Sequence, residues 1–276
     1  MIKKKLKKKE GRIFVGKTDI NCNKVLSKSR VKYIQSLFHK KFRDIENRYI
    51  IEGPKIINEF LLKSPGIIYE LYATEQWLKN NSIPAYQIAP DKLITINDDD
   101  LKKISSLPSP NQALAIIQKF DEPFAAVTAN EYILMLDEIQ DPGNMGTIIR
   151  IADWFGITKI ICSNNCADMY NAKVIQSTMG SILRVQVLYT DLVDWCKKHS
   201  NMPVYAATLH GKSIYETTPT GNGIILMGNE SKGIKPELLA LSNVHITIPR
   251  IGEAESLNAA VATGIILSHF TQQGGL

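Results

Sequence analysis

The sequence of 276 residues has no long apolar run and few cysteines. No stretch approaches the ~18 consecutive apolar residues that a membrane-spanning helix requires. The basic start, MIKKKLKKKE, is not followed by the apolar segment of a secretory signal. Hydrophobic residues make up 44% of the chain and charged residues 22%, which is ordinary for a globular protein. These features predict a soluble cytoplasmic protein with no membrane partner.

The four cysteines do not form a metal-binding pattern. Cys162 and Cys166 are spaced CxxxC, whereas Cys22 and Cys196 each stand alone. A zinc site needs a second pair of cysteines or histidines at a matching spacing, which this sequence does not have. We therefore expect four reduced thiols and no metal site.

Positive charge is concentrated at the N-terminal end. Residues 1–48 contain 16 Lys and Arg against 4 Asp and Glu, a net charge of +12. The other 228 residues contain 17 against 23, a net charge of −6, and the two parts add to the +6 of the whole chain. Such an end suits the phosphate backbone of a nucleic acid. Residues 1–26 show no apolar periodicity, so we expect a basic disordered tail that either binds a phosphate backbone or is only solvated.

A basic helix is predicted directly after this tail. It begins at Ser27 or Ser29, either of which can cap it, and it carries an apolar stripe. The stripe consists of Val31, Ile34, Leu37, Phe38, Phe42 and Ile45. Basic side chains occupy the other faces and are candidate RNA-binding residues, namely Arg30, Lys32, Lys40, Lys41 and Arg43.

The pattern of strands and helices divides the chain into two α/β domains. Residues 27–120 alternate short strands and helices, which predicts a small α/β domain, and residues 121–130 have the composition of a linker. Residues 131–276 alternate strands and helices more regularly, which predicts a parallel sheet with helices on both faces. Ligands of such sheets bind beyond the carboxyl ends of the strands. The strands predicted there are 132–138, 159–163, 184–189, 203–209, 223–228 and 244–249, and the helices are 144–155, 169–182, 191–199, 235–241 and 257–270.

Three unusual segments lie at those strand ends. The first is DPGNMGTIIR, residues 141–150, whose Pro-Gly pair suits a turn. Asn144 can cap the following helix, and Gly146 permits the close approach of another backbone. Arg150 falls six residues after Asn144, about 120° around the helix. Taken alone, the segment also fits a capped turn with a surface arginine.

The second segment is LMGNESKGI, residues 226–234. It has two glycines and a lysine but lacks the GxxxxGK[ST] spacing of a nucleoside triphosphate site. Gly228 can let a ligand approach the backbone, and Glu230 is expected to project from the strand end. The alternative is a plain strand-to-helix turn.

The third segment is IPRIGEAESLNAAVATGI, residues 248–265. Ser256 and Asn258 flank Leu257 at the start of the last predicted helix. Both are small polar residues that can cap a helix or hydrogen-bond a ligand.

In this order, the three segments resemble the signature motifs of SpoU-type RNA 2′-O-methyltransferases of the SPOUT superfamily. The resemblance covers residues 131–271, and residues 29–120 more weakly resemble the substrate-binding domain that often precedes this catalytic domain. The matching residues are Asn144, Gly146, Arg150, Gly228, Glu230, Gly233, Ile248, Pro249, Gly252, Ser256, Leu257 and Asn258.

The resemblance implies an α/β fold in which the C-terminal parallel sheet carries a deep trefoil knot, preceded by a small α/β substrate-binding domain. It also implies S-adenosylmethionine as the cofactor, held in a cup that the knot forms from the second and third segments. This cup takes the place of the GxGxxG turn of dinucleotide-binding folds, which the sequence lacks. The residues implied to line it are Leu226, Met227, Gly228, Ile248, Leu257 and Asn258.

The implied reaction is methylation of a ribose 2′-hydroxyl without a metal. Arg150 would bind the adjacent phosphate or steady the developing alkoxide, because a guanidinium with a pKa of ~12.5 or higher is a poor base. Asn144 would position the ribose. Glu230, Ser256 and Asn258 would hold Arg150 and the methionine end of the cofactor.

Relatives of this type pair through the catalytic domain, so the resemblance implies a homodimer whose sites take groups from both subunits. It implies RNA as the substrate, and ribosomal RNA by analogy with enzymes that carry an added N-terminal domain. Transfer RNA stays open as a substrate, as do base methylation and a non-catalytic RNA- or ribosome-binding role for residues 1–48. The chain departs from the family pattern at Ser231, Arg250, Glu253 and Glu255, which changes the charge around the implied cofactor cup.

Overall fold

The protein was analysed as a computed structural model, which describes residues 14–15, 18–19, 26–81, 88–120, 123–128 and 130–272. The chain forms two compact units, Met1–Phe120 and Asp121–Leu276. Among the described residues, no helix is long and apolar enough to cross a bilayer. Most of the predicted basic tail lies outside the described residues. Within it, Phe14–Val15 (β1) and Thr18–Asp19 (β2) pair as antiparallel strands, which differs from the disorder expected there.

The first unit contains a four-stranded sheet in the order β3-β6-β4-β5. Strands β4 and β5 are parallel, and the other neighbours are antiparallel. Ile34 of α1, Leu37 of the turn after it and Ile104 of α5 pack onto sheet residues such as Leu114. The elements are α1 (Lys28–Ser36), α2 (Lys40–Glu46), β3 (Arg48–Glu52), α3 (Pro54–Lys63), β4 (Ile68–Thr74), α4 (Glu75–Asn80), β5 (Leu93–Ile96), α5 (Asp98–Ile104) and β6 (Ala113–Gln118).

The predicted basic helix is in fact two helices. Ser27 caps α1 as expected, but the chain turns at Leu37–His39 before α2 begins. Because the chain turns before α2, the face of α2 that packs against the interior is not the one expected for a single continuous helix. The residue that α2 buries is Arg43. Phe42 and Ile45 remain 42% and 66% exposed. The predicted apolar stripe is therefore wrong at these two residues.

Arg43 is also wrong as a predicted RNA-binding residue. Its side chain is 2% exposed, and its Nη1 donates hydrogen bonds to the carbonyl oxygens of Leu37 (3.1 Å) and Phe38 (2.8 Å). The guanidinium therefore holds the turn between α1 and α2 together and does not face solvent.

Arg30 is largely committed to the interior of the first unit. It forms an ion pair with Glu70, and its Nε donates to the hydroxyl of Tyr72 at 2.7 Å. Such a neutralised, partly buried guanidinium is a poor phosphate contact. The exposed candidates Lys32, Lys40 and Lys41 stay predictions.

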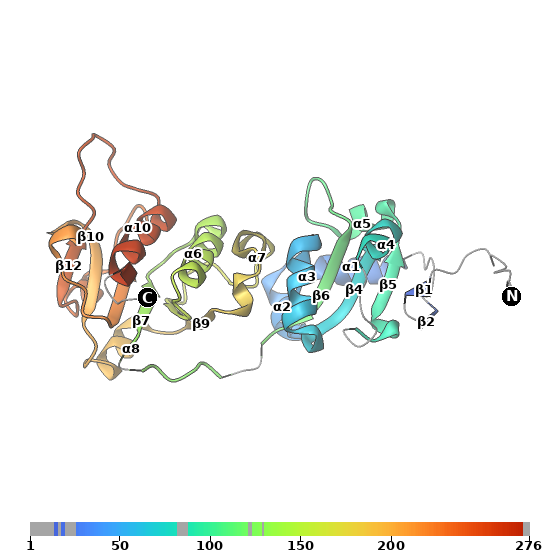
Figure 1. Ribbon diagram of the computed structural model, residues 1–276, viewed down its shortest axis with the longest axis horizontal. Coiled ribbons are helices and arrows are strands. Elements are labelled where there is room, and N and C mark those ends of the chain that lie inside the picture. Colours follow the sequence, from blue (N-terminus) through green and yellow to red (C-terminus); the bar gives the residue numbers. More distant parts are fainter. Residues whose placement is uncertain are drawn as a thin grey trace, which may run out of the picture. The chain divides into compact units, whose positions relative to one another are not determined.

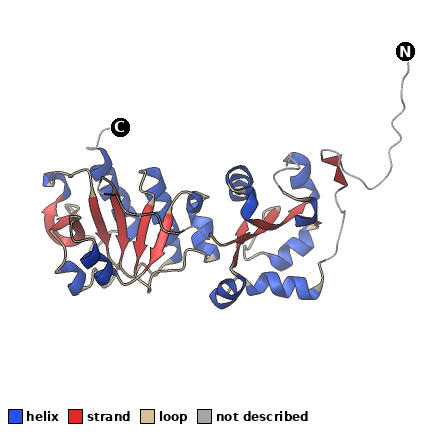
Figure 2. Ribbon diagram, turned by 90° about the horizontal axis from the view of Figure 1, so that it is seen from below, coloured by secondary structure: helices blue, strands red, loops and turns tan. Residues whose placement is uncertain are grey.

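The second unit is built on a six-stranded parallel sheet in the order β12-β10-β11-β7-β8-β9 (Figures 1 and 2). The predicted parallel sheet is thereby confirmed. Its elements are β7 (Tyr132–Leu136), α6 (Pro142–Trp154), β8 (Lys159–Cys162), α7 (Ala172–Thr178), β9 (Gln186–Tyr189), α8 (Leu192–Lys198), β10 (Val204–Ser213), β11 (Gly223–Met227), α9 (Pro236–Leu239), β12 (Val244–Thr247) and α10 (Ala259–Gln272).

Two groups of helices cover this sheet. Trp195 of α8 and Leu238 of α9 pack with Ile133, Met135 and Leu226 of the central strands. Helices α6, α7 and α10 form the second group, in which α6 contacts both of the others; Figure 1 shows α6 beside α10. Strands β7 and β11 are neighbours, with Leu136 opposite Met227. The first and second segments therefore leave the sheet side by side.

The described part of the predicted linker is attached to the second unit. The backbone N–H of Ala125 donates to the side chain of Gln186 at 2.9 Å, and Lys159 donates to the carbonyl oxygen of Ala126 at 2.9 Å. Phe124 and Val127 pack against the same core as α8 and α9. Residues 123–128 therefore pack against the second unit and form part of it.

Candidate functional site

The first segment forms the turn from β7 into α6. Asp141 is the N-cap of α6, since its side chain accepts a hydrogen bond from the backbone N–H of Asn144 at 2.8 Å. This hydrogen bond is the main cause of a lowered pKa at Asp141. The sequence analysis assigned the capping role to Asn144. That prediction is wrong, because the cap is Asp141, three residues earlier. Because Asp141 caps the helix, the side chain of Asn144 is free to reach other segments.

The side chain of Asn144 joins the three segments. Its Nδ2 donates to a carboxylate oxygen of Glu230 in the second segment. Its Oδ1 accepts from Nδ2 of Asn258 in the third segment at 2.8 Å. Asn258 also caps α10, because its Oδ1 accepts from the backbone N–H groups of Ala260 (3.0 Å) and Val261 (3.3 Å). Three polar residues that lie up to 114 positions apart thus form one continuous hydrogen-bonded chain.

Gly146 marks the close crossing of α6 and α7. A Cβ at this position would collide with the carbonyl oxygen of Val174 and lie 2.5 Å from Cβ of Ser177. The expectation that Gly146 permits close backbone approach is confirmed, and the partner is α7. This contact fixes the start of α6, from which Asn144 projects.

Arg150 lies outside this hydrogen-bonded chain. Its side chain is exposed on α6, and the described part of the protein offers it no hydrogen bond or ion pair. Six residues of helix separate it from Asn144, which is about 9 Å along the axis and about 120° around it. The implied contact of Glu230, Ser256 or Asn258 with Arg150 is therefore not made within one chain.

The second segment forms a closed loop after β11. Asn229 and Gly233 exchange two backbone hydrogen bonds of 3.0 and 2.9 Å. A Cβ on Gly228 would lie 2.5 to 2.6 Å from the backbone of Gly233 and the next residue. Gly228 is thus required for the loop to close on itself, and the close approach expected of a ligand is instead made by the protein backbone.

The residues implied to line the cofactor cup differ in exposure. Leu226 and Met227 are buried at the end of β11, and Gly228 and Ile248 are half-buried. Ser256 is exposed, and Leu257 is 46% exposed. The residues implied to line the cup therefore run from a buried strand end to an exposed loop.

Thr208 belongs to this region and was not expected from the sequence. It lies in β10, between β11 and β12, and its Oγ1 is buried without a hydrogen-bond partner among the described residues. A buried hydroxyl without a partner is costly unless a bound group satisfies it. No sequence signal separates Thr208 from the many threonines that are merely structural.

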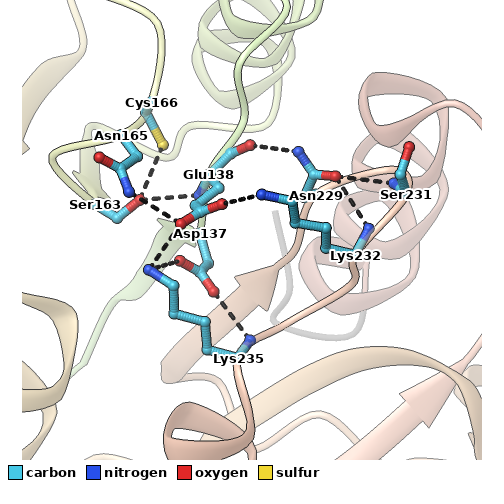
Figure 3. Close-up of polar contacts among 9 residues, drawn as sticks. All are labelled: Asp137, Glu138, Ser163, Asn165, Cys166, Asn229, Ser231, Lys232 and Lys235. Carbon is cyan, nitrogen blue, oxygen red and sulfur yellow. Dashed lines mark hydrogen bonds and ion pairs between the residues drawn. The ribbon is translucent and has the colours of Figure 1, made fainter.

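A second polar cluster lies beside the loop and was also not expected (Figure 3). Glu138, the second residue after β7, accepts from Asn165 (3.0 Å) and Lys235 (2.9 Å) and forms an ion pair with Lys232 (3.4 Å). The hydrogen bond from Asn165, followed by that from Lys235, lowers the pKa of Glu138 to about 2. Glu138 raises the pKa of Lys235 in turn. The acidic pair before DPGN was visible in the sequence, but its lysine partners are about 95 residues away.

The described cysteines do not form a metal site. Cys162, Cys166 and Cys196 are buried free thiols. Burial raises the pKa of the Cys162 thiol. No cluster of three or more metal-ligating side chains occurs among the described residues. Cys22 lies outside them.

Residues 131–268, half of the chain, match the SpoU rRNA Methylase family, and the match includes all three segments. The chain belongs to the SpoU rRNA methylase family. The prediction made from the three segments is confirmed. Residues 28–115 of this SpoU protein match the MRM3-like substrate binding domain.

Relatives of this SpoU protein include enzymes named for their reaction. The 23S rRNA (guanosine(2553)-2′-O)-methyltransferase RlmP of Bacillus subtilis is 31% identical over 243 residues, which are 87% of this chain and 95% of RlmP. The 23S rRNA (uridine(2479)-2′-O)-methyltransferase of Streptomyces viridochromogenes is 26% identical, over 67% of this chain and 66% of that enzyme.

Solved structures share the fold over most of the chain. A TrmH-family protein from Porphyromonas gingivalis superimposes with a TM-score of 0.78 and 35% identity, covering 90% of this chain and 98% of that one. An AdoMet-bound rRNA methyltransferase from Sinorhizobium meliloti has a TM-score of 0.78 and 27% identity, covering 90% and 97%.

Proposed function

We propose that this SpoU-family protein transfers a methyl group from S-adenosylmethionine to a ribose 2′-hydroxyl of ribosomal RNA. One observation carries the proposal. Asn144, Glu230 and Asn258, one polar residue from each SpoU segment, are hydrogen-bonded to one another at the carboxyl end of the sheet. The family, the reactions named for its relatives and an AdoMet-bound neighbour support the same activity.

The residues around β10 and β11 fit the proposed cofactor. Thr208 Oγ1 is a buried hydroxyl without a partner among the described residues, and Leu226 and Met227 are apolar residues at the end of the neighbouring strand β11. Ile248 and Leu257 follow in the third segment. When bound, S-adenosylmethionine supplies an electrophilic methyl group on a sulfonium, so the chemistry needs no metal.

The protein's own side chains then have to hold the ribose and stabilise the oxygen that loses its proton. Asn144 is held by Glu230 and Asn258, so its amide is fixed in orientation before RNA binds. A fixed amide can position a ribose without further ordering. The guanidinium of Arg150 has no hydrogen-bond or ion-pair partner among the described residues, so it can bind the neighbouring phosphate or the developing alkoxide. Ser256 is exposed in the third segment, where it can hydrogen-bond the methionine end of the cofactor.

The position of Arg150 supports a homodimer. Within one chain it points away from Asn144 by about a third of a turn and lies about 9 Å along α6. A second copy related by two-fold symmetry can place its Arg150 at the first copy's Asn144. Large apolar side chains are exposed on the same helix group, with Trp154 of α6 83% exposed and Val261 of α10 52% exposed. Such side chains are typical of a covered interface.

We also propose the trefoil knot that the family resemblance implies. The path of the chain supports it, because β12 lies at one edge of the sheet and α10 then returns to pack on α6, which follows β7. We further propose that the first unit binds RNA and that the protein acts in the cytoplasm. The match to a substrate-binding domain, the exposed Lys32 and Lys41 and the net positive charge of residues 1–48 support RNA binding. The similarity to the bacterial 23S rRNA methyltransferase RlmP supports the cytoplasm.

The decisive experiment maps ribose methylation across all cellular RNA with and without this protein. We expect loss of methylation at one or a few ribosomal RNA riboses, restored by the wild-type protein and not by Asn144→Ala. Calorimetry with S-adenosylmethionine in the presence of a chelator should show binding. Binding without any change in RNA ribose methylation would contradict the proposed reaction and favour base methylation. Loss confined to transfer RNA would contradict the proposed substrate.

A further inference from the structure

The backbone at Glu138 has an unusual conformation. Its φ is 55°, in the left-handed region that residues other than glycine and asparagine rarely occupy. Such residues persist where their surroundings hold them, and they are enriched at functional sites. Glu138 is the second residue after β7 and lies three residues before Asp141, the cap of the helix that carries Asn144. Contacts with the surrounding structure must therefore hold this conformation.

The contacts of Glu138 come from two directions. Its backbone N–H donates to Oγ of Ser163 at 2.9 Å, and its carboxylate accepts from Asn165 at 3.0 Å, both just beyond β8. Its carbonyl oxygen accepts from Nδ2 of Asn229 at 2.9 Å. Its carboxylate also lies between Lys235 (2.9 Å) and Lys232 (3.4 Å) (Figure 3). Glu138 thus links the end of β8 to the loop of residues 228–235.

The same loop is closed and held at both ends. Asn229 Oδ1 accepts from the backbone N–H groups of Ser231 (2.9 Å) and Lys232 (3.1 Å), which fixes the turn at the loop's tip. At the far end, the backbone N–H of Lys235 donates to the Asp137 carboxylate at 3.0 Å. Glu230 lies between these anchors, so its position depends on them.

We propose that Glu138 is a positioning residue that uses its carboxylate to hold the 228–235 loop, and with it Glu230 and the backbone at Gly228, in the shape that binds the cofactor. The proposal rests on the proposed function, because the loop forms one wall of the proposed cofactor cup. Glycine would adopt the left-handed backbone at lower cost but would not bridge two lysines. The Glu138 carboxylate is therefore needed to hold the 228–235 loop and not to form the turn after β7.

The experiment compares Glu138→Gly with the wild-type protein. Glycine keeps the left-handed backbone and removes only the side chain. Hydrogen–deuterium exchange of residues 229–235 is measured without cofactor, S-adenosylmethionine affinity by calorimetry, and Tm beside both. We expect loop exchange to accelerate and the cofactor Kd to rise, each on the order of tenfold, as for the loss of a charged hydrogen bond. Because the ion pairs of Glu138 also stabilise the fold, the Tm should fall as well. Exchange should accelerate in residues 229–235 and not throughout the second unit, whereas a merely structural role predicts faster exchange throughout the unit.

A second variant keeps the experiment decisive if Glu138→Gly does not fold. Lys235→Met leaves the Glu138 backbone untouched and removes its shorter ion pair, so it should show the same faster exchange and weaker binding. Lys103→Met is the matched control, because it breaks the 2.7 Å ion pair with Asp100 in the first unit and should leave both readouts unchanged. Wild-type exchange and wild-type affinity in a folded Glu138→Gly or Lys235→Met would overturn the proposal. If the wild-type protein binds no cofactor, the proposed function fails, while unchanged loop exchange in these variants would separately overturn the positioning role.

Discussion

At the scale of single residues, Arg150 is the side chain on which the proposed chemistry most depends. If its guanidinium acts on the 2′-oxygen or the neighbouring phosphate, Arg150→Ala should lower single-turnover methyl transfer on the order of 100-fold, as for loss of a transition-state donor. Arg150→Lys should rescue little, because an ammonium lacks the planar set of donors. Cofactor affinity should be unchanged, since the cup is built from the other two segments.

Thr147→Ala is the control for Arg150, because Thr147 is exposed on the same helix. It should leave turnover intact. An exposed arginine with no catalytic role would shift stability by under about 0.5 kcal/mol on substitution and would also leave turnover intact. Near-normal turnover in Arg150→Ala would therefore remove this residue from the mechanism.

Glu138 predicts a pH dependence of stability. Its pKa is about 2 in the folded protein and near the ordinary glutamate value, about 4.3, in the unfolded chain. A lowered folded-state pKa contributes stability above the unfolded pKa, and this contribution is lost as pH falls from about 4.3 to about 2. In urea unfolding, wild type should be more stable than Glu138→Gln at pH 7, and the difference should shrink toward pH 2.

The partners of Glu138 provide the check. Lys235→Met removes the same interaction from the other side, so its difference from wild type should shrink over the same pH range. Lys232 and Asn165 also contact the Glu138 carboxylate and are unchanged in both variants. Asp137 forms its own 3.5 Å ion pair with Lys235, which only Lys235→Met removes. A difference that is constant from pH 7 to pH 2.5 would show that Glu138 does not stabilise the fold through its charge.

The contacts between side chains of the candidate site were only partly predictable from the sequence. The three segments pointed to Asn144, Glu230 and Asn258, because parallel strands end at one edge of a sheet. The pattern did not show that Asp141 would take the capping role, which frees Asn144. The importance of Thr208 and Glu138 could not be predicted from the sequence. A buried hydroxyl without a partner and a positive φ can be recognised only in the folded structure.

At the scale of secondary-structure elements, the regular second unit was predictable and the first less so. Buried parallel strands are continuous apolar runs such as YILML and GIILM, so β7 and β11 stand out. In the first unit, α4 has six residues and β5 has four, which is too short for a period to show. The break between α1 and α2 was missed because no Pro or Gly marks it and because Arg43 satisfies the carbonyl groups of the turn.

The crossing of α6 and α7 gives a prediction at this scale. Gly→Ala inside a helix ordinarily stabilises by up to about 1 kcal/mol. At Gly146 the added Cβ would collide with Val174 and lie 2.5 Å from Cβ of Ser177. We therefore expect Gly146→Ala to destabilise the protein by about 1–3 kcal/mol, because overpacking forces the helices apart. Urea unfolding measures the change.

Gly264→Ala in α10 is the matched control. Its Cβ would meet only Ile151 at 3.7 Å, which is ordinary contact, so this variant should be neutral or slightly stabilised. Equal effects of the two substitutions would show that the α6–α7 crossing does not depend on Gly146. Gly146→Ala should also weaken catalysis, because the start of α6 carries Asn144.

At the scale of the whole molecule, the separation of Asn144 and Arg150 leads to a test of the proposed dimer. The Arg150→Ala and Asn144→Ala proteins should each have strongly reduced activity alone, by a factor on the order of 100 for Arg150→Ala. If a site combines Asn144 of one subunit with Arg150 of the other, a mixed dimer of the two variants contains one intact site and one site that lacks both residues. Random exchange of subunits makes half of the dimers mixed, so about a quarter of all sites should be active. If both residues act within one chain, every site lacks one of them and no activity returns.

Co-refolding the two variants at equal concentration and measuring single-turnover methyl transfer separates these outcomes, with light scattering to confirm that the samples are dimers. Absence of recovered activity in a dimeric mixture would place Arg150 and Asn144 in the same subunit's site and contradict the shared site proposed here.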